Sequence, residues 1–255
     1  MAVVEPIPGK PAATASIPGG EALVVADYHA GIEQSLRADG LEVESRAERR
    51  RERLLSLVDQ TGVDRVVFLG DLAHDVGRPS GGEIEELTAL LDALPVPATL
   101  VKGNHDGAVE AVLADGDVTT DALTVTDPSG VRLGAVGFVH GHTWPASDVL
   151  SGAVVCVGHE HPAVRIEDEV GGARVERAWL RGPLDPAPFQ DRSGPPPEST
   201  PDCELIVFPA FNDRSGGTWV NVPGQSFLAP FLPAALRGGQ VYLLDGTRLG
   251  EYAAV

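Results

Sequence analysis

The chain has 255 residues, of which 43% are hydrophobic, and it carries a formal net charge of −18 at pH 7. This length and apolar content exclude a disordered chain and are sufficient for one large domain with a sizeable core. The apolar runs have only the length of strands, and the N-terminal residues lack the features of a signal peptide. We therefore expect a cytoplasmic protein without a membrane partner.

The basic residues are almost all arginine. Of the 19 basic residues only Lys10 and Lys102 are lysine. An acidic, lysine-poor composition is typical of proteins from salt-loving organisms, in which high ionic strength screens the repulsion between like charges. An ordinary acidic protein is the alternative. Strong acidity normally argues against nucleic-acid binding, but salt screening weakens that exclusion.

The first half of the chain alternates strand and helix patterns. The predicted elements are a strand at 22–27, a helix at 43–60, a strand at 64–71, a helix at 83–94 stopped by Pro95, and a strand at 98–102. We expect the charged segment 44–51 to be a solvated helix face. The alternation predicts βαβ units with a parallel sheet, whose ligands gather at the carboxyl ends of the strands.

The second half of the chain is rich in strand patterns. The predicted strands are 122–126, 131–139, 153–157, 163–167, 174–180, 205–208 and 241–244. Strands continue on both sides of the proline-rich stretch near 182–201, so we interpret it as a surface insertion in a single domain spanning 1–255. Cys156 and Cys203 show no disulfide signature, and Cys156 is expected in the core.

All seven histidines lie at or just after predicted strand ends. They occur with acidic, amide and glycine companions in the segments Asp27-Tyr28-His29, Gly70-Asp71-Leu72-Ala73-His74, Gly103-Asn104-His105-Asp106, His140-Gly141-His142 and Gly158-His159-Glu160-His161. Residues i and i+2 of a strand share a face, so both histidines of the last segment can reach one cleft. Imidazole and carboxylate together suit Mn, Fe or Zn.

The order of these motifs resembles that of the calcineurin-like metallophosphoesterases. The flanking residues are similar to an archaeal phosphoesterase group related to bacterial phosphoesterases found alongside a DNA ligase and a helicase. The resemblance implies an α/β fold, a β-sandwich of mixed sheets flanked by helices. It also implies hydrolysis of a phosphate ester, with a phosphodiester of a nucleotide or nucleic acid favoured and DNA repair proteins as partners. Tyr28 replaces the usual leucine of that group and is expected to point away from the metals.

The same resemblance implies two divalent metal ions, with Mn²⁺ favoured and Fe, Zn or Ni as alternatives. One ion would be held by Asp27, His29, Asp71 and His161, and the other by Asp71, Asn104, His140 and His159. Asp71 would bridge the two ions. His105 would be the general acid, and Asp106 would either orient His105 or cap a helix.

The roles of several residues stay open. His142 is either a partial metal ligand or a substrate contact. His74 contacts the phosphate, lies behind the ligands, or is a simple loop residue. Arg78, Lys102 and the segment 211–217 are candidates to line the cleft.

Two other classes of function compete with a hydrolase. The first is a non-catalytic scaffold on the same fold, but such scaffolds tend to lack the histidine that this chain keeps as His105. The second is a structural zinc protein, which usually draws on several cysteine thiolates, whereas Cys156 has no partner nearby in the sequence. Both alternatives fit the sequence less well than a hydrolase does.

Overall fold

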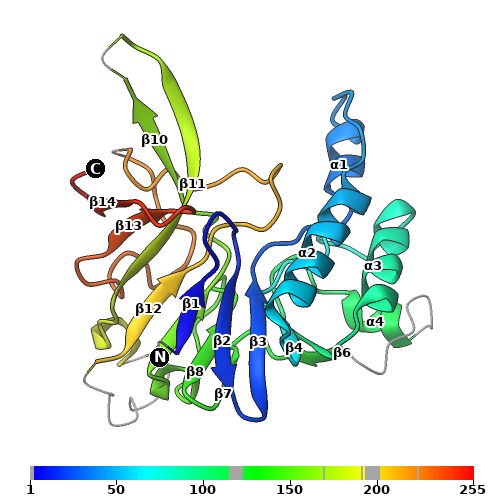
Figure 1. Cartoon of the computed structure of the whole chain (residues 1–255), viewed down its shortest axis with the longest axis horizontal. Helices are drawn as coiled ribbons and strands as arrows, with labels where there is room; N and C mark the ends of the chain where they lie inside the picture. Colours follow the sequence, from blue (N-terminus) through cyan, green and yellow to red (C-terminus); the bar gives the residue numbers. More distant parts are fainter. Residues whose placement is uncertain (1–2, 115–122, 169, 191, 193–201, 223) are drawn as a thin grey trace.

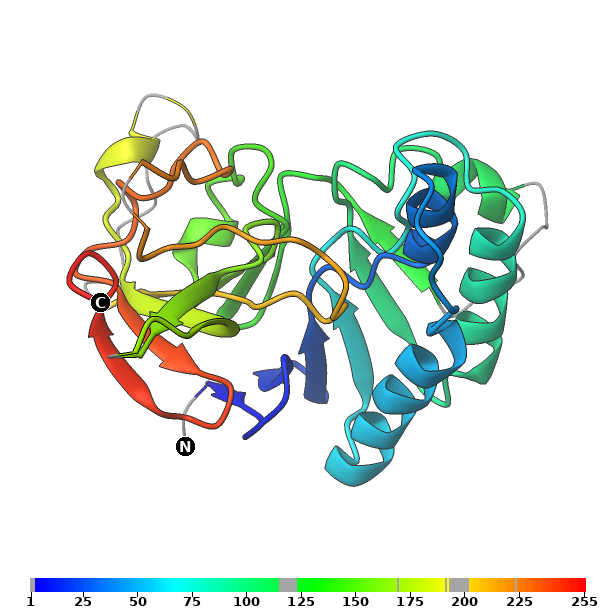
Figure 2. The ribbon, with the colours of Figure 1, turned by 90° about the horizontal axis from the view of Figure 1, so that it is seen from above.

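Two mixed β-sheets stack face to face, and the α-helices cover the outer face of the first sheet only (Figures 1 and 2). The structure is a computed structural model, and it describes residues 3–114, 123–168, 170–190, 192, 202–222 and 224–255. The predicted α/β sandwich of mixed sheets is confirmed.

The first sheet has the strand order β1-β2-β3-β4-β5-β6. Its strands are β1 Val4–Pro6, β2 Ala13–Ile17, β3 Gly20–Val25, β4 Arg65–Phe68, β5 Ala98–Val101 and β6 Leu123–Thr126. The strands from β3 to β6 are parallel, as predicted from the strand and helix alternation. The antiparallel edge strands β1 and β2 were not predicted. The helices are α1 Ile32–Ala38, α2 Ala47–Thr61, α3 Gly82–Ala93 and α4 Val109–Ala114.

The second sheet has the order β14-β13-β11-β12-β9-β8-β7, and β10 pairs with β11 outside this path. Its strands are β7 Val131–Leu133, β8 Val136–Val139, β9 Val154–Val157, β10 Ala163–Glu167, β11 Ala173–Pro183, β12 Glu204–Val207, β13 Gln240–Leu243 and β14 Arg248–Glu251. The single strand predicted at 131–139 is wrong. Gly134 adopts a φ of 63°, and the chain turns there so that β7 pairs antiparallel with β8.

Alternation along the strands sorts the apolar side chains into three layers. In β3, Leu23 and Val25 pack under the helices, whereas Val24 faces the second sheet. In β9, Val155 packs on the outer side of the second sheet, and Cys156 lies between the sheets as predicted. Both sheets are therefore buried on both faces, which explains their nearly continuous apolar sequences.

The charged face of α2 differs from its prediction. The helix begins at Ala47, and Arg50 is buried rather than solvated. Its guanidinium donates to Glu33 at 3.1 and 3.2 Å and to Glu86 at 2.8 Å. A buried arginine requires such carboxylate partners, and these lie on α1 and α3, far from α2 in the sequence.

Part of the proline-rich stretch forms regular secondary structure. β11 continues to Pro183, and a 3₁₀ turn spans Ala187–Phe189, where Phe189 packs against Trp144 and Phe231. Residues 191 and 193–201 of the predicted insertion lie outside the described residues. Among the helices that the structure describes, none has the length and apolar character needed to cross a membrane.

Candidate metal centre

The carboxyl ends of strands from both sheets bring the predicted site residues together. Asp27 follows β3, and Asp71 follows β4 in the first sheet. His140 follows β8, and His159 follows β9 in the second sheet. The two sheets join beside these loops through a parallel bridge between Ala26 and Ala210. The site therefore lies at the edge where the sheets meet, the position expected for ligands of parallel strands.

One group of donor atoms comprises Asp27, His29 and His161, whose ligand atoms all lie within 4.8 Å of one another. His161 Nε2 lies 3.2 Å from Asp27 Oδ1 and 3.4 Å from His29 Nε2. These three residues belong to the first predicted ligand set.

A second group comprises Asp71, His140 and His159, also within 4.8 Å. His140 Nε2 lies 3.4 Å from Asp71 Oδ2 and 3.1 Å from Asn104 Oδ1. The same Asp71 oxygen lies 3.9 Å from His29 Nε2 of the first group. Asp71 thus stands between the two groups, where a shared ligand would have to be.

The backbone is strained at these donors. Among the described residues, those with a positive φ that are not glycine are Asp27, His29, Asp71, His159 and His161, with φ between 45 and 70°. Side chains of L residues disfavour this region, and such strain persists only where the surroundings enforce it, typically at functional sites. Every one of these residues is a predicted metal ligand.

Two glycines leave room for the donors. A Cβ on Gly103 would overlap the Asp71 carboxylate, and a Cβ on Gly70 would overlap the His140 ring. Gly70 also has a φ of 76°, which a side chain would disfavour. The glycines of the Gly-Asp and Gly-Asn-His motifs therefore let the strand ends approach closely.

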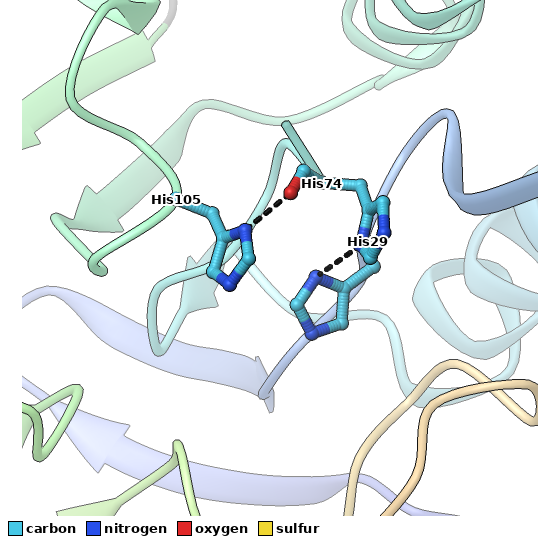
Figure 3. A group of neighbouring side chains, drawn as sticks. All are labelled: His29, His74 and His105. Atoms are coloured by element: carbon cyan, nitrogen blue, oxygen red, sulfur yellow. Dashed lines mark hydrogen bonds between the residues drawn. The ribbon is translucent and has the colours of Figure 1, made fainter. Parts of the chain in front are cut away.

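Main-chain carbonyl groups orient three of the histidines. The Nδ1 atoms of His161 and His140 bond to the carbonyl oxygens of Gly216 at 2.8 Å and Leu69 at 2.7 Å. The Nδ1 atom of His105 bonds to the carbonyl oxygen of His74 (Figure 3). A donated Nδ1–H leaves Nε2 free as the atom that faces the site, as in histidines that bind metal ions.

The His29 ring is oriented by a second histidine. Its Nδ1 lies 3.3 Å from Nδ1 of His74 (Figure 3). The His74 backbone is fixed in turn, because Glu83 of α3 accepts hydrogen bonds from the amides of His74 and Asp75 at 2.6 and 3.0 Å. Of the alternatives left open for His74, a position behind the ligands fits these contacts best.

The electrostatics of the site favour a cation. Burial alone would raise the pKa values of Asp27 and Asp71, but the facing histidines lower both below their ordinary range. Burial lowers the pKa of His29 to about 3 and of His159 to about 4. Burial alone would lower the pKa values of His140 and His161, but the facing carboxylates raise both, that of His140 to about 9. At pH 7 His29 and His159 are therefore neutral, whereas His140 and His161 would release a proton when an ion binds.

Asp106 has a different role from either one expected for it. Its buried carboxylate accepts hydrogen bonds from the amides of Gly103 at 2.8 Å and Ala73 at 3.1 Å. These bonds tie the loop after β5 to the loop after β4. The His105 ring bonds to the His74 carbonyl instead, and α4 begins only at Val109. Asp106 therefore holds loops and neither orients the His105 ring nor caps this helix.

Asn212 supports the backbone of the first donor group. The sequence analysis named it only as a member of the candidate segment 211–217. Its side-chain amide donates to the carbonyl oxygens of Tyr28 at 2.9 Å and His29 at 3.2 Å. Its backbone amide donates to the carbonyl oxygen of Asp27 at 3.1 Å. A single buried asparagine thus holds the strained Asp27-Tyr28-His29 turn from the second sheet. The repeated polar residues around position 212 were the only signal in the sequence.

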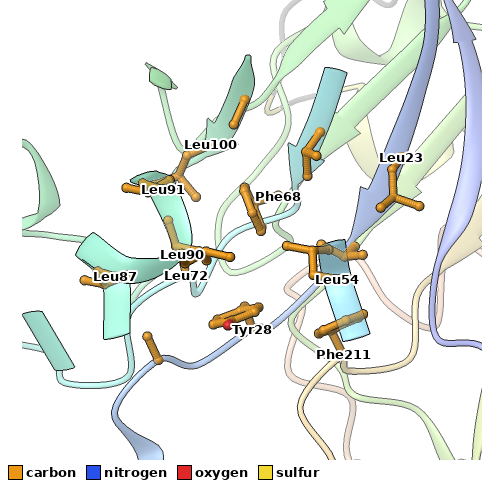
Figure 4. Close-up of a cluster of buried hydrophobic side chains, with 14 of the residues drawn as sticks. Leu23, Tyr28, Leu54, Phe68, Leu72, Leu87, Leu90, Leu91, Leu100 and Phe211 are labelled. Atoms are coloured by element: carbon orange, nitrogen blue, oxygen red, sulfur yellow. The ribbon is translucent and has the colours of Figure 1, made fainter. Parts of the chain in front are cut away.

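Tyr28 points away from the donors, as expected. Its ring is buried beneath α2 and α3, stacked on Phe211 at 5.9 Å between centroids and edge-on to Phe68 (Figure 4). Glu160 likewise turns inward between two histidines and accepts hydrogen bonds from the Ala229 amide and the Thr218 hydroxyl. Tyr28, between Asp27 and His29, and Glu160, between His159 and His161, therefore anchor these two turns in the fold.

The donors face a pocket of about 420 Å³. Its lining includes His105 and His74, helix α1 on one side and the segment 214–216 on the other. His142 lies beside the second donor group, with its ring 5.3 Å from His140 and 6.1 Å from His159, and its buried Nδ1 lacks a hydrogen-bond partner. Lys102, a candidate for the cleft, instead pairs with Glu110 at 2.5 Å.

These residues fit divalent metal ions. The site combines two clusters of imidazole and carboxylate groups, one amide oxygen and an unpaired buried imidazole nitrogen. Such a mixed donor set suits Mn, Fe or Zn, because these ions accept both nitrogen and oxygen ligands.

Comparison with known proteins identifies the class. Residues 21–178 match the model of the calcineurin-like phosphoesterase superfamily domain, and the chain belongs to this superfamily of metal-binding phosphoesterases. No curated protein sequence matches the chain.

Solved structures with a similar fold are distant in sequence. A Pseudomonas putida nuclease, MPE, is 17% identical with a TM-score of 0.52, and the match covers 96% of this chain and 100% of that one. YfcE, a phosphoesterase from E. coli, is also 17% identical, with a TM-score of 0.37 and coverage of 90% and 96%. At these identities the likeness to the nuclease concerns the fold alone.

Proposed function

We propose that the protein is a dinuclear metal-dependent phosphoesterase that hydrolyses a phosphodiester of a nucleotide or nucleic acid. The observation that carries this proposal is the position of Asp71 between two donor groups at one pocket. Asp27, His29 and His161 would complete one ion site. Asn104, His140 and His159 would complete the other. When bound, two such ions would activate a water molecule and stabilise negative charge on the phosphoryl oxygens.

We infer that His105 acts on the leaving group. Its ring lines the pocket, and Nε2 lies 3.9 Å from Asp71 Oδ2. The His74 carbonyl accepts the Nδ1 hydrogen of His105, so that Nε2 is the ring atom that would pass a proton to the departing oxygen. The ring is bound through Nδ1 to the main chain, which fixes its direction and limits its freedom.

The proposal also includes the identity of the metal ions, the cellular environment and the protein partners. We infer Mn²⁺ as the preferred ion, a cytoplasm of high ionic strength as in salt-loving archaea, and DNA repair proteins as partners. The lysine-poor composition supports the salt inference. A scaffold without catalysis would not require a histidine at the position of His105, nor its carbonyl contact.

Hydrolysis assays test this function. Metal-depleted protein, loaded with Mn²⁺, Zn²⁺ or Fe²⁺ in molar KCl, should be assayed with bis(4-nitrophenyl) phosphate, 4-nitrophenyl phosphate, a nucleotide diester and DNA. We expect the diesters to be hydrolysed faster than the monoester, and a chelator to abolish activity. Failure of every metal-loaded form on every ester would favour the scaffold. A preference for the monoester would overturn the diester assignment.

A further inference from the structure

An arginine cluster adjoins the pocket on the side of α2. Arg46 pairs with Asp213 at 2.9 Å, and the Arg53 guanidinium lies 4.1 Å from the centroid of the Phe211 ring and donates to the Phe211 carbonyl. Arg177 of β11 donates to the carbonyl oxygen of Ala210 at 2.9 Å. These cations come from a helix and a strand and converge on one loop, which reaches from the second sheet toward α2 (Figure 2).

The cluster has more positive than negative charge. Burial alone would raise the pKa of Asp213, but Arg46, Arg53 and Arg177 lower it. Within the described residues, neither Arg53 nor Arg177 has a carboxylate within salt-bridge distance, and the buried Arg53 Nε lacks a hydrogen-bond partner. Arg49 is exposed, and together with Arg46, Arg53 and Asp213 it lines a small depression of about 10 Å³. One carboxylate thus faces several guanidinium groups.

This imbalance differs from the rest of the molecule. The chain as a whole carries a net charge of −18, and several arginines elsewhere each pair with one carboxylate. Arg181 pairs with Glu204, and Arg132 pairs with Asp148. A half-buried surplus of arginine with one exposed member, Arg49, favours an anionic ligand in so acidic a protein, because guanidinium groups match phosphate oxygens in geometry and charge.

The cluster is continuous with the candidate metal centre. Asp213 is followed directly by Arg214 and Ser215, which line the pocket. Arg214 extends to the loop before α2, where its Nη2 donates to the carbonyl oxygen of Glu44 at 3.0 Å. The buried Ser215 Oγ has no hydrogen-bond partner. A chain of phosphates leaving the pocket along this loop would therefore meet Arg214 and then the cluster.

We propose that Arg46, Arg49 and Arg53 bind a phosphate neighbouring the one that is hydrolysed, and that the substrate is a polynucleotide strand rather than a mononucleotide. This inference rests on the proposed phosphodiesterase function and specifies its substrate. The repeated phosphates of one strand would occupy the metal centre and the arginine cluster together, so that binding at the cluster would raise the local concentration of scissile bonds.

Binding of a fluorescein-labelled single-stranded 12-nucleotide DNA tests the cluster. Anisotropy with EDTA, from about 0.1 to 0.5 M KCl, gives the dependence of log K on log salt. Each phosphate of a single strand that is no longer neutralised reduces this slope by about 0.7, so Arg46→Gln/Arg49→Gln, which removes the contact to one phosphate, should reduce it by about 0.7. The matched control, Arg132→Gln/Arg248→Gln, changes net charge equally at two exposed arginines on the second sheet. The control should keep the parent slope.

Folding and catalysis are measured separately. Arg49→Gln alone removes an exposed side chain, so it serves as a second variant if the loss of the Arg46 pair with Asp213 lowers the melting temperature. We also expect the ratio of kcat/KM for the oligonucleotide to kcat/KM for bis(4-nitrophenyl) phosphate to fall about tenfold in the double variant. The control ratio should not change.

The outcomes separate the two proposals. Equal losses in the double variant and its control, or no loss in either, would overturn the arginine site even if small diesters are hydrolysed. Loss of DNA binding confined to the cluster variants, in a protein that hydrolyses no ester, would support the arginine site and overturn the proposed phosphodiesterase function.

Discussion

The rings of His29 and His74 meet through their Nδ1 atoms, 3.3 Å apart, on the side of His29 that is opposite the donor group. One ring must donate and the other accept, because a hydrogen bond needs a single proton between the two nitrogens. His74 therefore fixes the direction of the His29 ring and couples the tautomers of the two rings.

Removing His74 should loosen metal binding while leaving the predicted ligands in place. We expect His74→Ala to weaken the ion held by His29 by 10–100-fold, the usual effect of losing a partner behind a ligand. Competition with a chromogenic chelator measures this affinity. Asp75→Ala, at an exposed neighbouring side chain, is the control. Unchanged affinity in His74→Ala would assign that residue to the loop or the substrate instead.

Asp71→Asn should disturb both ion sites. Its Oδ1 accepts the His105 amide, and Oδ2 faces both donor groups, so the substitution removes the charge shared between them. Metal analysis after dialysis should show fewer than two ions per chain. Two tightly bound ions in Asp71→Asn would refute the bridging role.

In contrast, Asp106→Asn should retain the metal and lose about 1–3 kcal/mol of stability, because an amide cannot accept both backbone hydrogen bonds equally well.

His105→Ala should separate catalysis from metal binding. The predicted ligands remain, so metal content should match that of the parent. We expect a loss on the order of 10²–10⁴-fold in rate for diesters with nucleoside leaving groups, and a smaller loss for nitrophenyl esters, whose leaving group barely needs a proton. Equal losses on both substrates would indicate stabilisation of the transition state. No loss on either would place the active site elsewhere.

Arg50→Met should strongly destabilise the fold. It would leave Glu86 as a buried carboxylate without its cation and Glu33 with Arg214 alone, 3.5 Å away, a change that costs about 3–5 kcal/mol. Denaturant unfolding in molar KCl measures the free energy. Arg49→Met, one position earlier on the exposed side of α2, should change it by about 0.5 kcal/mol or less. A similar small change in Arg50→Met would show that the buried triad contributes little.

Salt should stabilise the folded chain. With a net charge of −18, repulsion between carboxylates opposes folding until salt screens it, and the Debye length falls to about 3 Å at 1 M. Thermal melts in increasing KCl should therefore show a rising melting temperature. A flat or falling series would remove the basis for inferring a salt-loving source.

The fold and the donor residues were largely predictable because the signals were local. Each buried strand ended in a short polar motif, and the ends of parallel strands meet at one edge of a sheet, so Asp27 and Asp71 had to lie near one another in the first sheet, as do His140 and His159 in the second. The short elements β1, α1, α4 and β14 escaped prediction, because they have too few residues to establish a periodicity.

The supporting residues escaped prediction because their partners are remote in sequence. Asn212 bonds to the Tyr28 carbonyl across 184 positions, and Arg50 meets Glu86 across 36. Such contacts join polar side chains to backbone groups or to charges on other helices, and no spacing rule connects them. The Asp106 carboxylate was misinterpreted for the same reason, since one of its two partners, the amide of Ala73, belongs to another loop.

The division of the donors between the two sheets has a consequence for protein synthesis. His29 and His161 are 132 residues apart, and Asn212 must still follow to hold the Asp27 turn. A nascent chain that has emerged from the ribosome only through the first sheet would therefore hold, in the proposed assignment, no complete ion site. In that assignment, hydrolysis of phosphate esters would begin only after the second layer has been translated and docked.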